Sequence, residues 1–163
     1  MLKKHIPISV VLETTLACNM NCIHCGSSAG IRRDQELSTK EGMHLCDDLN
    51  QLGTRLVSLM GGEPFLRKDW EEIALYIRDL NMNVTLMSNG LIIDEKIISK
   101  LRKIDPYAVT LSLDGATAKI HNSIRGVDKS FEGCMNSLNL LTKADLPTTV
   151  ITKIGRASCR ERV

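Results

Sequence analysis

Strands and helices alternate strictly along this chain, and that alternation limits the fold more than any other feature. Short apolar, β-branched stretches predict five strands: Ile6–Thr14, Arg55–Met60, Asn83–Met87, Ala108–Leu113 and Thr148–Thr152. Helices are expected between them, opening at Ser38, Asp69, Asp94 and Ser130. This order predicts an α/β fold with a parallel sheet and right-handed crossovers.

Two architectures have this order of elements, an open doubly wound sheet and a β/α barrel. The first strand–helix turn lacks G-x-G-x-x-G, which disfavours a dinucleotide-binding sheet. A complete eight-strand barrel takes about 250 residues, and this chain has 163. If the fold is a barrel, five strands make only part of one.

Composition excludes several classes of function. The net charge is +2 and aromatic residues make up 3%, so neither a basic field nor a stacking platform points to nucleic acid. No apolar run approaches the roughly 20 residues of a membrane span. The apolar run Ile6–Leu12 is interrupted by Pro7, so no signal peptide is expected. We expect a reducing, cytoplasmic setting.

Three cysteines follow the first predicted strand in the pattern Cys-x3-Cys-x2-Cys, at Cys18, Cys22 and Cys25. Closely spaced thiols in a non-secreted chain usually bind metal or take part in catalysis. A 4Fe–4S cluster is usually held by four Cys, so three would leave one iron open to a small molecule. A structural zinc site with His24 as fourth ligand is the alternative, although His24 lies between two of the cysteines and would have to fold back.

Three further unusual stretches also follow predicted strands directly: Gly61–Pro64, Ser88–Gly90 and Ser112–Gly115. Ligands bind at the carboxyl ends of the strands in parallel β/α folds, so these stretches and the cysteines are expected at one site. The remaining Cys46 and Cys134 fall on apolar helix faces and are expected to be buried hydrophobic residues.

The cysteine spacing resembles the signature of the radical S-adenosylmethionine (radical SAM) enzymes, and Gly61-Gly62-Glu63-Pro64 resembles their GGEP-type motif. The resemblance implies a 4Fe–4S cluster on Cys18, Cys22 and Cys25, with S-adenosylmethionine chelating the open iron. Reductive cleavage would yield a 5′-deoxyadenosyl radical that abstracts hydrogen from a substrate. The fold implied is a six-strand partial (β/α)6 barrel, of which residues 1–153 would supply five strands.

The same resemblance assigns roles around the ligand. Gly61–Pro64 would hold the methionyl amine, because glycines let the backbone approach closely and Glu63 adds an acceptor. Ser88 and Asn89 would border the ribose and methionyl part, although Asn-Gly is also a common turn. His24 would contact the adenine.

The stretch Ser112-Leu113-Asp114-Gly115 with His121 and Arg125 resembles the SPASM or twitch subgroup, which includes sulfatase-maturing enzymes and peptide maturases. The resemblance implies that Ser112 and Arg125 bind the ligand carboxylate, with Asp114 capping the loop. It also implies a peptide or protein substrate and an external flavodoxin- or ferredoxin-like electron donor. The alternatives are a polar loop with solvated His121 and Arg125, an enzyme of small-molecule cofactor synthesis, and a non-enzymatic zinc module.

Residues 154–163 match the translation of a common sequencing adaptor and have no helix or strand period. We interpret them as an adaptor-derived artefact and exclude them from the fold. The expectation is then a natural chain that continues beyond residue 153.

Overall fold

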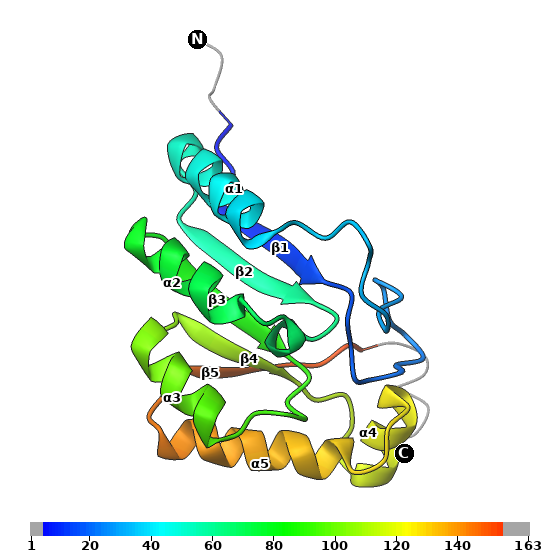
Figure 1. The fold of residues 1–163 in the computed structure, drawn as a ribbon. Coiled ribbons are helices and arrows are strands. Elements are labelled where there is room, and N and C mark those ends of the chain that lie inside the picture. The colour runs from blue at the N-terminus through cyan, green and yellow to red at the C-terminus, as the bar shows by residue number, and fades with distance from the viewer. Residues whose placement is uncertain (1–4, 155–163) are drawn as a thin grey trace.

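The five predicted strands form one parallel sheet in the computed structural model, which describes residues 5–154 (Figure 1). The strands are β1 (Ser9–Thr15), β2 (Leu56–Gly61), β3 (Asn83–Ser88), β4 (Ala108–Ser112) and β5 (Thr148–Ile151). Their order in the sheet is β1-β2-β3-β4-β5, and every neighbouring pair is parallel. A doubly wound sheet reverses its order at a switch point. The unreversed order therefore confirms the expected α/β fold as part of a barrel wall.

The helices are α1 (Thr39–Leu52), α2 (Trp70–Asp79), α3 (Glu95–Ile104), α4 (Ala118–Arg125) and α5 (Ser130–Lys143), with a short 3-10 turn η1 (Pro64–Leu66). Figure 1 shows α1, α2, α3 and α5 side by side on one face of the sheet, as right-handed crossovers require. The short helix α4 lies apart from them, beside the loop that follows β1.

Two of the predicted helix starts are confirmed by their caps. The Ser38 hydroxyl accepts from the Glu41 N–H at 3.3 Å, and the Ser38 N–H donates to the Glu41 carboxylate at 2.8 Å, which completes a capping box. The Asp94 carboxylate accepts from the Ile97 N–H at 2.9 Å. Both helices therefore begin where the sequence predicts.

The other two predicted helices also begin where expected, α2 directly after Asp69 and α5 at Ser130, but neither has a side-chain cap. Asp69 makes no capping bond, because its carboxylate instead binds the Arg67 guanidinium at 2.7 Å and the Thr39 hydroxyl at 2.6 Å. The guanidinium is a charged donor and the backbone N–H a neutral one, so the carboxylate pairs with Arg67. Ser130 is the first helical residue rather than the cap, which is Lys129 in the left-handed conformation.

The helix α4, of eight residues, was not predicted, because its stretch was interpreted as part of a site motif after the fourth strand, with a polar loop as the alternative. Thr117 caps it, since its side chain accepts from the Ile120 N–H at 3.4 Å, and Gly126 ends it with φ of 67°. A Thr cap and a Gly stop nine residues apart are the signal that could have found it. The helix buries His121 and Arg125, so the alternative of solvated side chains is wrong.

The core lies between the sheet and the four covering helices. Strand side chains that point toward the helices are fully buried, namely Val57, Leu59, Val84, Leu86, Val109 and Leu111. Cys46 and Cys134 are buried as expected. The opposite face of the sheet carries polar side chains, including the pair Thr85 and Ser58, hydrogen bonded at 2.7 Å. The four helices thus cover the apolar face of the sheet, and polar side chains such as Ser58 and Thr85 lie on its opposite face.

No helix within residues 5–154 is long and apolar enough to cross a membrane. Residues 155–163 lie outside the described residues, so the interpretation of the tail as adaptor-derived stays a prediction.

Candidate functional site

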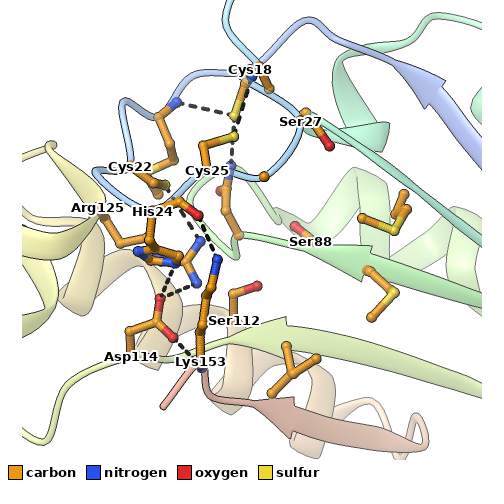
Figure 2. Close-up of a pocket in the computed structure, with 18 of the residues that line it drawn as sticks. Cys18, Cys22, His24, Cys25, Ser27, Ser88, Ser112, Asp114, Arg125 and Lys153 are labelled. Atoms are coloured by element: carbon orange, nitrogen blue, oxygen red, sulfur yellow. Dashed lines mark hydrogen bonds and ion pairs between the residues drawn. The ribbon is translucent and has the colours of Figure 1, made fainter. Parts of the chain in front are cut away.

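A cavity of about 380 Å³ opens at the carboxyl ends of the strands (Figure 2). Most of the predicted site residues line it: Cys18, Cys22, His24, Cys25, Gly61, Gly62, Ser88, Asn89, Ser112 and Arg125. Glu63 and Pro64 are buried outside its lining. The structure therefore brings together residues from all four strand-end stretches at one cavity.

The two ends of the cysteine loop are held together at its base. The Cys18 N–H donates to the Gly30 carbonyl at 3.1 Å, and the Gly30 N–H donates to the Leu16 carbonyl at 2.8 Å. Beside this closure, the Glu36 carboxylate accepts from the Thr15 hydroxyl at 2.9 Å and from the Leu16 N–H at 2.8 Å. Hydrogen bonds thus hold the start of the cysteine loop, at the end of β1, close to its end at Gly30 and Glu36.

The middle of the cysteine loop rests on the end of α4. The Asn21 N–H donates to the Arg125 carbonyl at 3.1 Å, and the Ile23 N–H donates to the Ile124 carbonyl at 3.0 Å. A Cβ at Gly126 would lie 2.3 Å from the Asn21 carbonyl oxygen, so only glycine permits this approach. The helix that sequence analysis missed is therefore the support that positions Cys22.

Each of the three thiols receives an N–H donor. The Met20 N–H points to Cys18 Sγ at 3.4 Å, the Ala29 N–H points to Cys25 Sγ at 3.3 Å, and Arg125 Nη1 lies 3.7 Å from Cys22 Sγ. Cys25 is exposed and the other two are half-buried, and burial raises the pKa of the Cys18 thiol. Within residues 5–154, no three His, Cys, Asp or Glu side chains converge on a single metal ion.

Gly61 and Gly62 pack against the backbone that leads into the cysteine loop. A Cβ at Gly61 would lie 2.1 Å from the Thr15 carbonyl oxygen, and one at Gly62 would lie 2.2 Å from that of Ala17. The Gly62 N–H donates to the Thr15 carbonyl at 2.7 Å. The two glycines were expected to let the backbone approach a ligand closely. In the structure, their lack of a Cβ also lets the backbone of residues 15–17 pack directly against them. Their other side lines the cavity.

Glu63 is fully buried behind the cavity and contacts two residues of its lining, Ser88 and Asn89. Its carboxylate accepts from the Ser88 hydroxyl and the Asn89 N–H, each at 2.9 Å, and from the Phe65 N–H at 3.4 Å. Burial raises the pKa of Glu63 to about 7, and these donors oppose the rise. Through these contacts Glu63 fixes the Ser88–Asn89 turn. Its direct contact with a ligand stays a prediction.

The Glu63→Gln variant should change how stability depends on pH. A folded pKa of about 7 against 4.5 means that the fold binds this proton more tightly than the unfolded chain does. The stabilisation is fully present below pH 4.5 and is lost as the pH rises through about 7. The unfolding free energy of the parent chain, relative to the variant, should fall by about 3 kcal/mol from about pH 4 to pH 8. Denaturant unfolding of the metal-free protein measures this, with exposed Glu95→Gln as control, and parallel pH curves for parent and Glu63→Gln would contradict it.

Asp114 connects the cysteine loop to the last two strands. Its Oδ2 lies 2.7 Å from Arg125 Nη2 and 3.2 Å from His24 Nε2. Neither N–H points well enough at this oxygen to form a directed hydrogen bond, so the Arg125 contact is an ion pair held by charge and the His24 contact is a close polar approach. Its Oδ1 accepts from the Lys153 N–H at 2.8 Å, and Lys153 Nζ donates to the His24 carbonyl at 2.7 Å (Figure 2).

Sequence analysis gave Asp114 only a loop-capping role and missed this connection. The available signal was its position directly after a strand, at the edge where ligands bind. The His24 imidazole points to Asp114, which counts against its use as a zinc ligand beside the thiols. Burial is the main cause that lowers the pKa of His24, with the neighbouring Arg125 and Lys153 charges adding to it and Asp114 opposing it.

A strand-end cavity with three thiols on one wall, in part of a β/α barrel, defines a protein built to hold a metal cluster beside a small molecule. The chain belongs to the Radical SAM superfamily, whose sequence profile matches residues 12–156. The cofactors shared by that family are a 4Fe–4S cluster and S-adenosylmethionine.

Similar proteins include a heme synthase and proteins named for maturation. The chain is 35% identical over 156 residues to the AdoMet-dependent heme synthase of Methanosarcina barkeri, covering 95% of this chain and 45% of that protein. It is 37% identical over 138 residues to mycofactocin maturase MftC of Mycobacterium tuberculosis, covering 85% and 35%. With the sporulation killing factor maturation protein SkfB of Bacillus subtilis, identity is 31% over 160 residues, covering 98% and 39%. The chain thus spans less than half of these relatives.

Among solved structures, Streptococcus suis SuiB bound to its precursor peptide SuiA superposes with a TM-score of 0.80 at 19% identity, covering 96% of this chain and 36% of that one. The anSMEcpe enzyme with bound AdoMet superposes with a TM-score of 0.77 at 21% identity, covering 94% and 45%. At these identities the likeness concerns the fold.

Proposed function

We propose that the protein is a radical SAM enzyme. A 4Fe–4S cluster on Cys18, Cys22 and Cys25 would cleave S-adenosylmethionine reductively, and the resulting 5′-deoxyadenosyl radical would abstract hydrogen from an organic substrate. One observation carries this proposal: three thiols line one wall of a 380 Å³ cavity whose other walls are the carboxyl ends of parallel strands. Family membership supports the same activity.

The residues present fit these cofactors on three counts. Three soft sulfur donors leave one iron of a cubane without a protein ligand. The cavity volume falls within the roughly 300–1,000 Å³ of small-molecule sites. Arg125 Nε is buried at the cavity edge without a hydrogen-bond partner among the described residues, and a buried cationic donor favours an anionic group nearby.

When bound, the two cofactors supply the electron transfer and the radical; the chain binds, orients and excludes water. The Gly61–Gly62 backbone would accept from the methionyl amine, and Ser112 with Arg125 would bind the carboxylate. Ser88 and Asn89, fixed from below by Glu63, would border the ribose.

His24 would border the adenine at the open end of the cavity. Its contacts with Asp114 and Lys153 hold that part of the cysteine loop against the sheet. The imidazole is therefore oriented by the chain itself.

A peptide or protein is the substrate class we propose. MftC and SkfB are maturases, and the SuiB structure is described as bound to a precursor peptide, which supports this class. Low-potential electrons would come from an external flavodoxin- or ferredoxin-like donor in a reducing cytoplasm. The subtype remains the SPASM or twitch subgroup, with residues 1–153 as its core and 154–163 as adaptor-derived.

A small-molecule substrate is the second candidate. It is favoured by 35% identity to an AdoMet-dependent heme synthase and 37% identity to an Fe-coproporphyrin III synthase, both of Methanosarcina barkeri. A substrate screen with precursor peptides encoded beside the gene and with iron porphyrins separates the two. Turnover of a porphyrin alone would overturn the peptide proposal.

Anaerobic reconstitution with iron and sulfide tests whether the protein binds the expected cluster. We expect about four iron and four sulfide per chain, and an electron paramagnetic resonance (EPR) signal after reduction that changes when S-adenosylmethionine is added. A colourless protein that binds one zinc would instead support the zinc module and contradict the cluster.

A further inference from the structure

Arg125 reaches one of the three thiols, and it does so from the end of a helix. Its Nη1 lies 3.7 Å from Cys22 Sγ, and its Nη2 lies 2.7 Å from Asp114 Oδ2. Figure 2 shows the guanidinium between the cysteine loop and Asp114. The planar guanidinium therefore spans a sulfur on one side and a carboxylate on the other.

Asp114 is held firmly enough to fix that geometry. It is 2% exposed, its N–H donates to His121 Nδ1 at 3.2 Å, and its Oδ1 accepts from the Lys153 N–H at 2.8 Å. His121 is itself fully buried against the Phe131 ring. Contacts other than the one with Arg125 thus hold both the backbone and the carboxylate of Asp114 in place.

The charge of the donor distinguishes Cys22 from the other two cysteines. Cys18 Sγ accepts from the Met20 N–H and from the Asn89 amide, and Cys25 Sγ accepts from the Ala29 N–H. These donors are neutral, and within the described part of the chain only Cys22 receives a charged one. A cation beside a thiolate favours the more negative state of a cluster, and hydrogen bonds to the sulfurs set its reduction potential.

We propose that Arg125 raises the reduction potential of the cluster through its contact with Cys22, and that Asp114 is the positioning residue that aims it there. This inference rests on the proposed function, since it concerns a cluster held by the cysteine loop. It goes beyond that function by assigning Arg125 a role toward the cluster and Asp114 a role toward Arg125.

The negative charge of Asp114 would by itself lower the potential, so its aiming role must be separated from its charge. A double-mutant cycle separates them. If Asp114 aims Arg125, then Arg125→Gln should change the potential much less in the Asp114→Asn background than in the parent. If Asp114 acts only by its charge, the change should be the same in both.

The experiment is anaerobic reconstitution of the parent protein, Arg125→Gln, Arg125→Lys, Asp114→Asn and the double variant, followed by potentiometric titration monitored by EPR. We expect Arg125→Gln to weaken cluster reduction by about tenfold, which is about 59 mV for one electron. Arg125→Lys should give a smaller fall, since an ammonium keeps the charge but cannot span both partners. Arg78→Gln is the matched control, because Arg78 pairs with Asp105 in a surface ion pair.

The outcomes are distinguishable. A parent protein that forms no cluster contradicts the proposed function itself. A parent with a cluster whose potential is unchanged in Arg125→Gln overturns this inference alone, and an equal fall in both Asp114 backgrounds overturns the positioning role. If the Asp114→Asn or Arg125→Gln protein does not load iron, Arg125→Lys decides: a potential equal to that of the parent contradicts the contact with Cys22.

Discussion

Replacing Cys22 by alanine should reduce both iron binding and S-adenosylmethionine cleavage to background. Cys22 is one of the three thiols that line the cavity within residues 5–154, so its loss leaves two irons of a cubane without protein ligands. Loss of an outer-shell partner already costs about 10- to 100-fold in metal affinity or activity, and loss of a ligand should exceed that. Iron and sulfide analysis after reconstitution, with 5′-deoxyadenosine measured after reduction, checks the expectation.

Cys46→Ala is the matched control for Cys22→Ala. Cys46 is fully buried in the core on the inner face of α1 and does not line the cavity. Its replacement should cost about 1 kcal/mol of stability through the small cavity it leaves, with iron content unchanged. A Cys22→Ala protein that still holds four iron and makes 5′-deoxyadenosine would refute the assigned ligand set.

The Gly62→Ala substitution should separate the end of β2 from the root of the cysteine loop. The new Cβ would lie 2.2 Å from the Ala17 carbonyl oxygen and 2.8 Å from that of Leu16, and neither backbone atom can rotate away. We expect a loss of more than about 4 kcal/mol in unfolding free energy, the range reserved for strongly disruptive substitutions. Cluster loading should fall with it, because Cys18 directly follows the displaced backbone.

Gly42→Ala is the comparison, because at Gly42 the structure has room for a Cβ. Gly42 lies within α1, and a Cβ there would meet Ile73 Cδ1 at an ordinary 3.6 Å. Alanine in a helix interior should stabilise the fold by about 0.5–1 kcal/mol. Denaturant unfolding of both metal-free variants tests the pair, and a Gly62→Ala protein as stable as the parent would show that this close approach is not required.

Local patterns in the sequence were enough to predict most of the architecture. The β-branched runs and the capping box at Ser38 depend on neighbours within a few residues, so they could be recognised without the fold. The cysteine spacing and the stretches after each strand predicted one site, because parallel strands end at the same edge of a sheet.

Contacts between distant parts of the chain could not be predicted in this way. The bond from Lys153 to His24 joins residues 129 positions apart, and Asp114 meets Arg125 and His24 only after the sheet has formed. The role of Gly62 depends on the register between β1 and β2, which no local pattern records.

The donor set of Glu63 was hidden for the same reason, since Ser88 and Asn89 come from the next strand. A glutamate beside a ligand motif suggests a direct contact, and burial with three donors adds a supporting role that no local pattern shows. Sequence therefore predicted which residues gather at the cavity better than it predicted which of them face it.

The most direct test of the account is anaerobic assay of the reconstituted protein with S-adenosylmethionine and dithionite, with 5′-deoxyadenosine and methionine quantified over time. We predict that both products appear together, only when reductant and cluster are present, and that Cys22→Ala yields neither while Cys46→Ala yields both. A protein that carries a 4Fe–4S cluster and binds S-adenosylmethionine, yet forms no 5′-deoxyadenosine on reduction, would contradict the proposed activity.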